Sequence, residues 1–270
     1  MKKVETKGIE SDLITDNTVA VYDLNKDVLL YENNLEKQVL PASLSKLFVV
    51  DYALTLLNPN DTVNITDEIN LVKPDSSMAH IEQGSMQVSE LVRGVLIPSG
   101  NDAAYALAAA GGRVLNNDIE ISGEEAVSVF MKGLNDYLKS EGYKDTIIDI
   151  PSGYSDNSFT TFADLLKVSK KILRNGLISE IVSQSEHYHT TESGNELHWI
   201  NTNEFLLPYS DYYNENVKGI KTGSLDTVYN LITRYKKDKG DYLIFVLGAA
   251  SSSERFNETN TIMQSLDKND

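Results

Sequence analysis

Segments typical of β-strands lie at both ends of this chain, and segments typical of helices lie between them. Near the N-terminus, residues 18–31 (TVAVYDLNKDVLLY) predict a hairpin that turns at 25–27. Near the C-terminus, residues 228–235 and 242–249 predict two further strands. The simplest way to bury these strands together is one antiparallel sheet built from both ends of the chain, with the helical segments packed against it.

Apolar residues at helical spacing predict the helices, and Ser, Asn, Pro and Gly mark their ends. The predicted helical segments are residues 43–57, 88–110 with a break at 98–100, 123–140, 160–174 and 254–266. Ser89 is the expected N-cap of the helix that begins near residue 88. These predictions favour an α+β fold, in which an antiparallel sheet is flanked by helices and a helical subdomain is inserted between its strands.

Composition excludes several classes of function. The chain has 270 residues, with 24 Lys and Arg against 40 Asp and Glu, a formal net charge of −16. Nucleic acids and anionic membranes require a basic face, so both are disfavoured as partners. The absence of cysteine excludes disulfides, thiolate-ligated metals and a thiol nucleophile. No apolar run reaches the roughly 18 residues of a membrane span, and the start MKKVETKGIESDL lacks the apolar core of an intact signal peptide.

Ser43 and Lys46 stand three residues apart at the start of the predicted helix 43–57, so their side chains share one face. A serine hydroxyl needs an adjacent base to act as a nucleophile, and a lysine can be that base when burial or another cation lowers its pKa. The motif alone is weak because the same spacing recurs at Ser265 and Lys268, and the alternative interpretation is a helix cap with a surface lysine. The first copy is the better candidate because a long apolar helix follows it.

The triplet Lys221-Thr222-Gly223 occurs once, shortly before the predicted strand 228–235. Lysine supplies a cation and threonine a hydroxyl, while glycine lets a ligand approach the backbone closely. This combination can receive a carboxylate group. The alternative interpretation is an edge strand that carries a solvated lysine.

Serine and asparagine are separated by one residue in three places, at 99–101, 155–157 and 193–195. The third copy falls in a predicted hairpin tip and is typical of a turn. The first copy lies between two predicted helices, which would hold a hydroxyl in place better than a polar loop does. Ser99 and Asn101 are therefore the preferred candidates.

Histidines offer the best candidate for a metal site. His187 and His189 alternate in the predicted hairpin 186–200 and so share a face, and His198 could lie across from them. Their spacing fits no known zinc pattern. Exposed hairpin side chains explain them more simply, so the sequence predicts no metal site.

Four longer segments, PASLSKL, LIPSGNDAA, INTNEFLL and VKGIKTGSL, closely resemble segments of the low-molecular-mass penicillin-binding proteins that are serine D-alanyl-D-alanine carboxypeptidases. The resemblance is colinear from about residue 10 to residue 266. It implies the fold shared by penicillin-binding proteins and β-lactamases. The expected arrangement is a single transpeptidase-like catalytic domain over 8–266, with a sheet lobe at 8–42 and 176–266 and a helical lobe at 43–175.

The resemblance implies a catalytic role for three side chains. Ser43 is expected to be the acyl-enzyme nucleophile, and Lys46 to take its proton. Ser99 is expected to relay a proton between Lys46 and the leaving amine. The backbone N–H groups of Ser43 and Ser224 are expected to form the oxyanion hole.

The resemblance also implies how the substrate is bound. Asn101 is expected to hold the substrate amide, and Lys221 with Thr222 to grip the terminal carboxylate next to Gly223. The cation of Lys221 is further expected to lower the pKa of Lys46. No metal or organic cofactor is needed for this chemistry.

By the same resemblance, the substrate is a peptidoglycan pentapeptide, β-lactams are covalent inhibitors, and the enzyme faces the cell wall outside the cytoplasm. The family's second, β-rich domain and its amphipathic membrane anchor are expected to be missing from this chain. Ser158 stands where the family usually has a histidine, so substrate preference or deacylation is expected to differ.

Two alternatives stay open. Class A β-lactamases are similar too, but their E-x-x-L-N loop is not found between Ser99 and Lys221, so a penicillin acyl-enzyme should hydrolyse slowly. The other alternative is a wall-binding or drug-sensing module that acylates but turns over poorly. Release of D-alanine from a D-Ala-D-Ala peptide separates this module from the enzyme.

Overall fold

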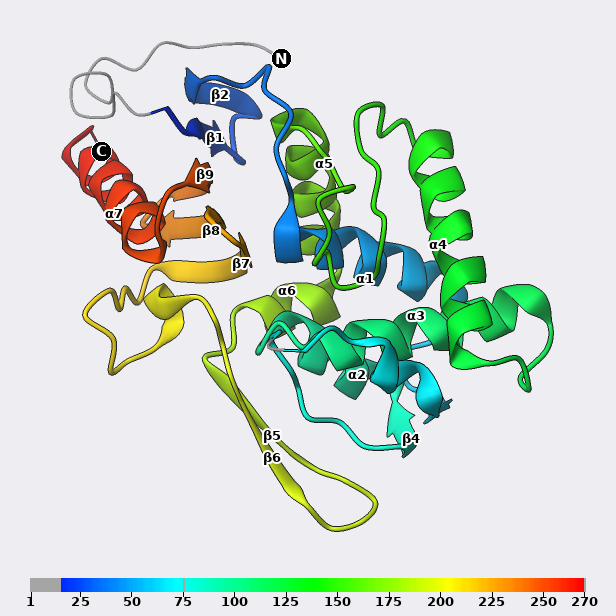
Figure 1. Ribbon diagram of the computed structural model, residues 1–270. Coiled ribbons are helices and arrows are strands. Elements are labelled where there is room, and N and C mark those ends of the chain that lie inside the picture. Colours follow the sequence, from blue (N-terminus) through cyan, green and yellow to red (C-terminus); the bar gives the residue numbers. More distant parts are fainter. Residues whose placement is uncertain (1–15, 75, 270) are drawn as a thin grey trace.

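The computed structural model describes residues 16–74 and 76–269. Its main sheet has five antiparallel strands in the order β2-β1-β9-β8-β7 (Figure 1). These strands are β1 (Thr18–Asp23), β2 (Val28–Asn33), β7 (Val217–Leu225), β8 (Val228–Lys237) and β9 (Gly240–Ala249). The N-terminal hairpin pairs with β9, so both ends of the chain build one sheet, which confirms the predicted α+β architecture.

The sheet is a middle layer because its strands bury both faces. Along β9, Ile244 and Val246 pack with Phe256 of helix α7 (Ser252–Asn269), while Phe245 packs on the opposite face. There the ring of Phe245 meets that of Phe162 edge-on at 5.1 Å between centroids. The result is α7 on one side of the sheet and the helices of the central chain on the other.

Six helices of the central chain form the layer on the face of the sheet opposite α7, and all of them except α6 lie close to predicted positions (Figure 1). They are α1 (Ser45–Leu56), α2 (Val88–Leu96), α3 (Asn101–Asn116), α4 (Gly123–Ser140), α5 (Phe162–Arg174) and α6 (Gly176–Val182). The predicted cap of α2 is wrong, because Gln87 precedes the helix and Ser89 lies in its first turn. Between α1 and α2 are β3 (Thr62–Ile65), the 3-10 turn η2 (Asp67–Leu71) and β4 (Gly84–Gln87).

Helix α1 is buried over most of its length. Its residues 45–53 are all buried, so the helix crosses the interior rather than lying on the surface. It is preceded by the 3-10 turn η1 (Ala42–Leu44), so Ser43 lies just before the helix and not in it. A residue on the first turn of α1 is therefore held in the core, whatever its polarity.

The segment that contains Lys221-Thr222-Gly223 is β7, an edge strand, as in the alternative interpretation of this triplet. Two glycines and two lysines interrupt its apolar residues, which hides the strand pattern. Its pairing with β8 shifts register between Val217 and Ile220. β7 packs against η1 and thereby brings the two segments together.

The predicted hairpin 186–200 is formed by β5 (Glu186–Thr190) and β6 (Glu196–Ile200). Among the described strands, β5 and β6 pair only with each other, and Figure 1 shows them apart from the main sheet. The hairpin is followed by the 3-10 turn η3 (Glu204–Leu206). In the part of the chain that the structure describes, no helix has the length and apolar character to cross a bilayer.

Candidate active site

Ser43 occupies a tight turn where the sheet meets the helices of the central chain. Ala42, immediately before it, adopts a φ of +49°, in the left-handed region that favours glycine. The N–H of Leu44 donates to the Pro41 carbonyl at 3.0 Å and closes the turn. Gly153 packs against the same turn, because a Cβ on it would lie 2.0 Å from the Ala42 carbonyl oxygen. The turn is thus fixed on two sides.

Lys46 is fully buried and its ammonium nitrogen meets three oxygens. Nζ lies 2.9 Å from Ser43 Oγ, 2.7 Å from Asn101 Oδ1 and 2.7 Å from the Ser152 carbonyl oxygen. These acceptors come from three separate parts of the chain, at positions 43, 101 and 152. The structure therefore brings together the Ser43, Lys46 and Asn101 that the sequence analysis selected.

Burial lowers the pKa of Lys46 to about 7, while the nearby charge of Asp102 acts in the opposite direction. At neutral pH a substantial fraction of this amine is therefore uncharged. A neutral amine keeps two N–H donors and gains one lone pair. The amide oxygen of Asn101 and the carbonyl of Ser152 can only accept, so they hold the two donors. The lone pair is then left for the hydroxyl of Ser43, the partner that can donate.

Ser99 lies in the short connection between α2 and α3 and is 3% exposed, with a φ of +61°. Gly100 follows, where a Cβ would lie 2.5 Å from that of Ala79. The N–H of Asn101 donates to the Ser77 carbonyl at 2.8 Å. This packing fixes the connection beside Lys46, while the proton relay through Ser99 stays a prediction.

The two other Ser-x-Asn copies have local partners. Ser155 and Asn157 both donate to Asp149 within their own loop. The copy at 193–195 sits at the hairpin tip and donates to Glu82. Neither arrangement includes the lysine at position 46.

Lys221 is 1% exposed, which is contrary to the alternative of a solvated lysine. Its Nζ donates to the Thr222 carbonyl at 3.1 Å. Burial holds the pKa of Lys221 well below its usual range, and the charges of Lys46 and Arg255 lower it further. The cation of Lys221 was expected to lower the pKa of Lys46, but the lowered pKa of Lys46 arises from burial. The Thr222 hydroxyl lies 2.5 Å from that of Thr202.

Gly223 is the point at which β7 touches the Ser43 turn. A Cβ at this position would lie 2.8 Å from the Pro41 carbonyl oxygen and 3.1 Å from the Leu44 nitrogen. Glycine is therefore required for close approach of the strand and not for a turn conformation. Ser224, the next residue, is exposed beside the turn.

Arg255 is a site residue that the sequence analysis missed. It lies on α7, is 6% exposed, and its Nη1 donates to the Gly223 carbonyl, Ser224 Oγ and the Asn230 carbonyl at 3.0–3.2 Å. Burial lowers the pKa of Arg255 to about 10. One arginine in a predicted amphipathic helix gives no spacing signal, so only the fold reveals it.

Asp102 was also missed, although it follows Asn101 directly. Its buried carboxylate accepts from the N–H groups of Ala79 and Ile81 at 2.7 and 3.0 Å. It thereby fastens the loop before β4 to the start of α3. The adjacent position in the sequence was a usable signal, because an acidic residue in the first turn favours a helix start.

Ser158 and the histidines have structural partners. Ser158 Oγ accepts from the Asp149 N–H at 3.0 Å and stabilises the loop that carries the Ser152 carbonyl.

His187 and His189 both contact Glu90 Oε2 on α2, at 2.8 and 3.1 Å.

His198 was expected to lie across from the other two hairpin histidines, and this is wrong. It pairs across the hairpin with Tyr188, stacks on that ring, and binds Glu186. His198 therefore belongs to the opposite face, and the three histidines do not converge.

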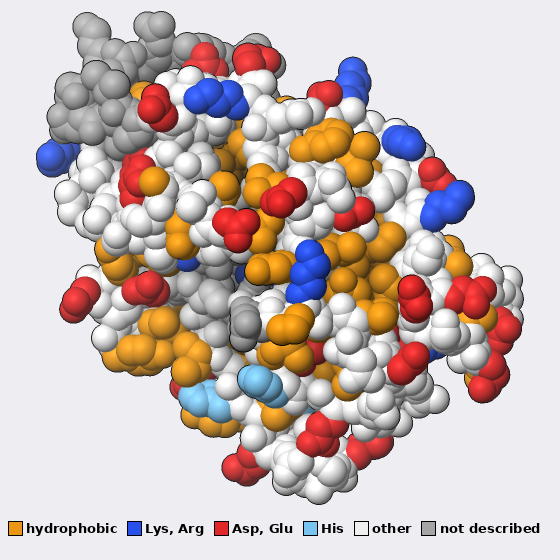
Figure 2. All heavy atoms as spheres, viewed as in Figure 1, with side chains coloured by type: hydrophobic (Ala, Val, Ile, Leu, Met, Phe, Trp, Pro, Cys, Tyr) orange, Lys and Arg blue, Asp and Glu red, His pale blue; other side chains and the backbone are white. Residues whose placement is uncertain are grey.

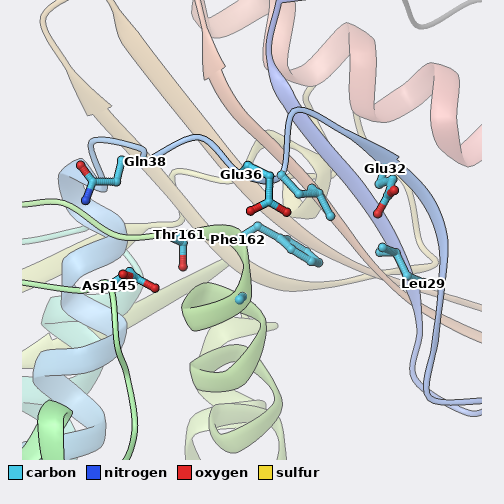
Figure 3. A pocket seen from close by; sticks show the side chains of 9 residues that line it. Leu29, Glu32, Glu36, Gln38, Asp145, Thr161 and Phe162 are labelled. Atoms are coloured by element: carbon cyan, nitrogen blue, oxygen red, sulfur yellow. The ribbon is translucent and has the colours of Figure 1, made fainter. Parts of the chain in front are cut away.

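A cavity elsewhere in the molecule is separate from this site. It lies between β2, the linker at 35–38 and the start of α5 (Figure 3). Three carboxylates line it, from Glu32, Glu36 and Asp145, together with apolar side chains. None of the site residues discussed above contributes to its lining.

Figure 2 shows that acidic side chains are spread over the face of the molecule drawn there rather than gathered at one place.

Comparison with known proteins places the chain in a family. The family model described as D-alanyl-D-alanine carboxypeptidase matches residues 5–251. The D-alanyl-D-alanine carboxypeptidase DacF of Bacillus subtilis is 26% identical over 234 residues, which cover 84% of this chain and 56% of that protein. DacA of Haemophilus influenzae is 28% identical over 268 residues, covering 95% of this chain and 63% of its own length. The chain thus spans less than two thirds of these relatives.

Solved structures share the fold. The Streptomyces K15 DD-transpeptidase superposes with a TM-score of 0.79 at 22% identity and covers 98% of both chains. A penicillin-binding protein of Listeria monocytogenes, solved in an ampicillin-bound form, superposes with a TM-score of 0.70 at 25% identity, covering 92% of this chain and 96% of the other. With the family model matched over most of its length, this chain belongs to the D-alanyl-D-alanine carboxypeptidase family.

Proposed function

We propose that this chain is a serine D-alanyl-D-alanine carboxypeptidase, which removes the terminal D-alanine of peptidoglycan stem peptides through an acyl-enzyme on Ser43. The observation that carries the proposal is the contact of 2.9 Å between Lys46 Nζ and Ser43 Oγ, in a site where burial lowers the pKa of the lysine to about 7. A base with a pKa near the working pH removes a proton most effectively.

The first step forms an ester. Ser43 Oγ attacks the carbonyl carbon of the penultimate D-alanine while its proton passes to Lys46. The negative oxygen of the tetrahedral intermediate is stabilised by the N–H groups of Ser43 and Ser224. The intermediate collapses, the peptide C–N bond breaks, and the amine of the terminal D-alanine leaves with a proton delivered from Lys46 through Ser99.

The second step releases the shortened peptide. A water molecule attacks the ester carbon while Lys46 accepts its proton, the bond between that carbon and Ser43 Oγ breaks, and Lys46 returns the proton to Ser43 Oγ. No electron is transferred, so the reaction balances without an oxidant or reductant. Side chains of this chain suffice for each proton transfer.

The carboxylate of the substrate would bind on β7. Lys221 and Arg255 are both buried, and repulsion by the charge of Arg255 contributes to the lowered pKa of Lys221. A bound carboxylate would offset that repulsion and favour the charged lysine. The hydroxyls of Thr222 and Thr202 lie at the same place and would donate to the carboxylate. Asn101 would hold the substrate amide beside Lys46.

The same site would react with β-lactams, because their ring amide presents a carbonyl in place of the peptide carbonyl, and a separate carboxylate lies near the ring nitrogen. In this case the leaving nitrogen stays attached to the acyl group and blocks the water. We place the reaction outside the cytoplasm, where its peptidoglycan substrate is found. Association with a membrane through a segment beyond this chain is part of the proposal.

Release of D-alanine tests the proposal. The chain is incubated with a diacetyl-L-Lys-D-Ala-D-Ala peptide and with the diastereomer that ends in L-Ala-L-Ala, and free alanine is measured with and without benzylpenicillin. We expect release from the first peptide alone, and its loss after penicillin. If a folded chain is labelled by penicillin but releases no D-alanine from the D,D-peptide, the proposal is wrong. The alternative of a module that acylates but turns over poorly would then hold.

A further inference from the structure

We propose that Asn230 is a positioning residue, which sets the distance between the Ser43 turn and β7. The inference rests on the proposed function, because these two segments supply the two N–H groups of the oxyanion hole. Asn230 belongs to none of the three segments that carry the catalytic residues. It lies on β8 and is completely buried.

The side chain of Asn230 fixes the entry to the turn. Its Nδ2 donates to the carbonyl oxygens of Leu40 and Pro41 at 2.9 and 3.2 Å. Its Oδ1 accepts from the N–H of Gly248 on β9 at 2.9 Å. Both amide hydrogens and the amide oxygen therefore have partners, and the contacts join β9 to the segment that leads into Ser43.

An irregularity in the sheet makes this orientation available. The pairing of β8 with β9 shifts register between Tyr229 and Leu231, with Asn230 at the shift. Gly248 opposite has a φ of +87°, which glycine adopts without strain. Such a shift redirects a side chain relative to a regular strand. Here the redirected side chain is the amide that reaches residues 40 and 41.

Asn230 is connected to β7 as well. Its backbone carbonyl accepts from Arg255 Nη1 at 3.1 Å, and the same nitrogen donates to the Gly223 carbonyl and to Ser224 Oγ. The Pro41 carbonyl that the Asn230 side chain holds is also the atom that Gly223 packs against. The amide therefore fixes the surface on which β7 rests.

Loss of this amide should move the Ser43 turn relative to β7. Oxyanion donors act only when they are aimed at the developing charge, and a displacement of about 1 Å can cost roughly a hundredfold in rate. Carboxylate binding depends on side chains of β7 and α7 that the substitution leaves in place. We therefore expect Asn230→Ala to lower kcat about tenfold to a hundredfold, with KM changed far less.

The experiment compares Asn230→Ala and Asn230→Ser with a matched control, Asn135→Ala. Asn135 is a partly buried amide that, like Asn230, donates to two backbone carbonyls, here of Met131 and Ile148, and accepts from a backbone N–H, that of Ile148. It joins α4 to a loop rather than contacting the turn. For each folded variant, kcat and KM with the D,D-peptide, the rate constant of acylation by benzylpenicillin, and the thermal midpoint are measured.

We expect Asn230→Ala and Asn135→Ala both to lose stability, and only the variants at position 230 to lose acylation rate. The acylation rate of Asn230→Ser, which keeps one donor, should lie between those of wild type and Asn230→Ala. Wild-type kcat in either folded variant at 230, or an equal loss of kcat in Asn135→Ala, would overturn the proposal. The failure of the proposed function itself would be recognised separately, because the wild-type chain would then release no D-alanine.

Discussion

The ammonium of Lys46 and the hydroxyl of Ser43 lie 2.9 Å apart, and the other two hydrogens of that ammonium are held by oxygens that cannot donate. Loss of one proton from the lysine therefore creates a lone pair with a single available donor, the Ser43 hydroxyl. The direction of proton transfer, from Ser43 to Lys46, follows from the donor and acceptor groups around the lysine. The transfer also requires a neutral amine, and burial provides it near pH 7 because it lowers the pKa of Lys46.

The rate of acylation should rise with pH and then level off. In the proposed mechanism the neutral form of Lys46 is the base, and with a pKa of about 7 its population falls about tenfold for each pH unit below that value. The rate constant for acylation by benzylpenicillin, measured from pH 5.5 to 9, should therefore have a midpoint near 7. A profile that is flat over this range would be inconsistent with a lysine base.

Asp102→Asn should move that midpoint to lower pH. The negative charge of Asp102 favours the protonated form of Lys46, so its removal lowers the pKa of the lysine further. The substitution also replaces an acceptor of two backbone N–H groups, at a cost of about 1–3 kcal/mol in the free energy of unfolding. The measurement is the pH profile of acylation together with urea unfolding.

Asp164→Asn is the control for this shift. Asp164 is 6% exposed and accepts from the Asp145 N–H and the Thr146 hydroxyl, so its substitution should destabilise the fold in a similar way. Its charge does not contribute to the pKa shift of Lys46. The same displacement of the midpoint in both variants would show that loss of stability, and not the charge of Asp102, causes it.

Gly223→Ala should impair catalysis with a modest effect on the rest of the fold. The added methyl group would lie 2.8 Å from the Pro41 carbonyl oxygen, so the strand and the Ser43 turn must separate. We expect about a hundredfold loss in the rate constant of acylation.

The control for Gly223→Ala is Gly176→Ala. Nothing lies within 4 Å of a Cβ at Gly176, the first residue of α6, so the same chemical change meets open space there. This variant should keep wild-type acylation, with a stability equal to wild type or slightly higher because alanine favours a helix. Equal activity of the two variants would contradict the packing argument.

Lys221→Met should weaken recognition of a free carboxylate without destabilising the chain. The substitution keeps an extended side chain but removes a buried amine whose charged form is disfavoured by burial and by the charges of Lys46 and Arg255, so the free energy of unfolding should stay constant or increase. KM should rise about tenfold for a peptide with a free C-terminal carboxylate, a loss in the range of one charged hydrogen bond. The same peptide with a C-terminal amide should show no such rise. Equal losses on both peptides would indicate that Lys221 acts on the chemistry and not on the carboxylate.

Periodicity predicts the helices and the sheet because burial imposes a repeat on the sequence. The helices near 123–140 and 160–174 and the strands at 228–235 and 242–249 were recognised in this way. β7 was not, because its glycine at 223 is required by a contact with a distant turn, and its lysine at 221 is buried. Tertiary packing overrides the local preference of this segment.

In the candidate site, too, some residues could be predicted from the sequence and others depend on tertiary packing. Spacing and resemblance selected Ser43, Lys46 and Asn101, which the structure brings into contact. Arg255 and Asn230 could not be selected, since their roles come from hydrogen bonds to the backbone of segments 18 or more residues away. Backbone carbonyls leave no mark in the amino-acid sequence.

The most direct test of the account is the site of acylation. The chain and its Ser43→Ala variant are treated with benzylpenicillin, and peptide mass spectrometry locates the penicilloyl adduct, with Ser265→Ala as the control for the second Ser-x-x-Lys copy. The account predicts one adduct, on the peptide that contains Ser43, which is absent in Ser43→Ala and present in Ser265→Ala. An adduct on any other residue, or one that persists in folded Ser43→Ala, would contradict it.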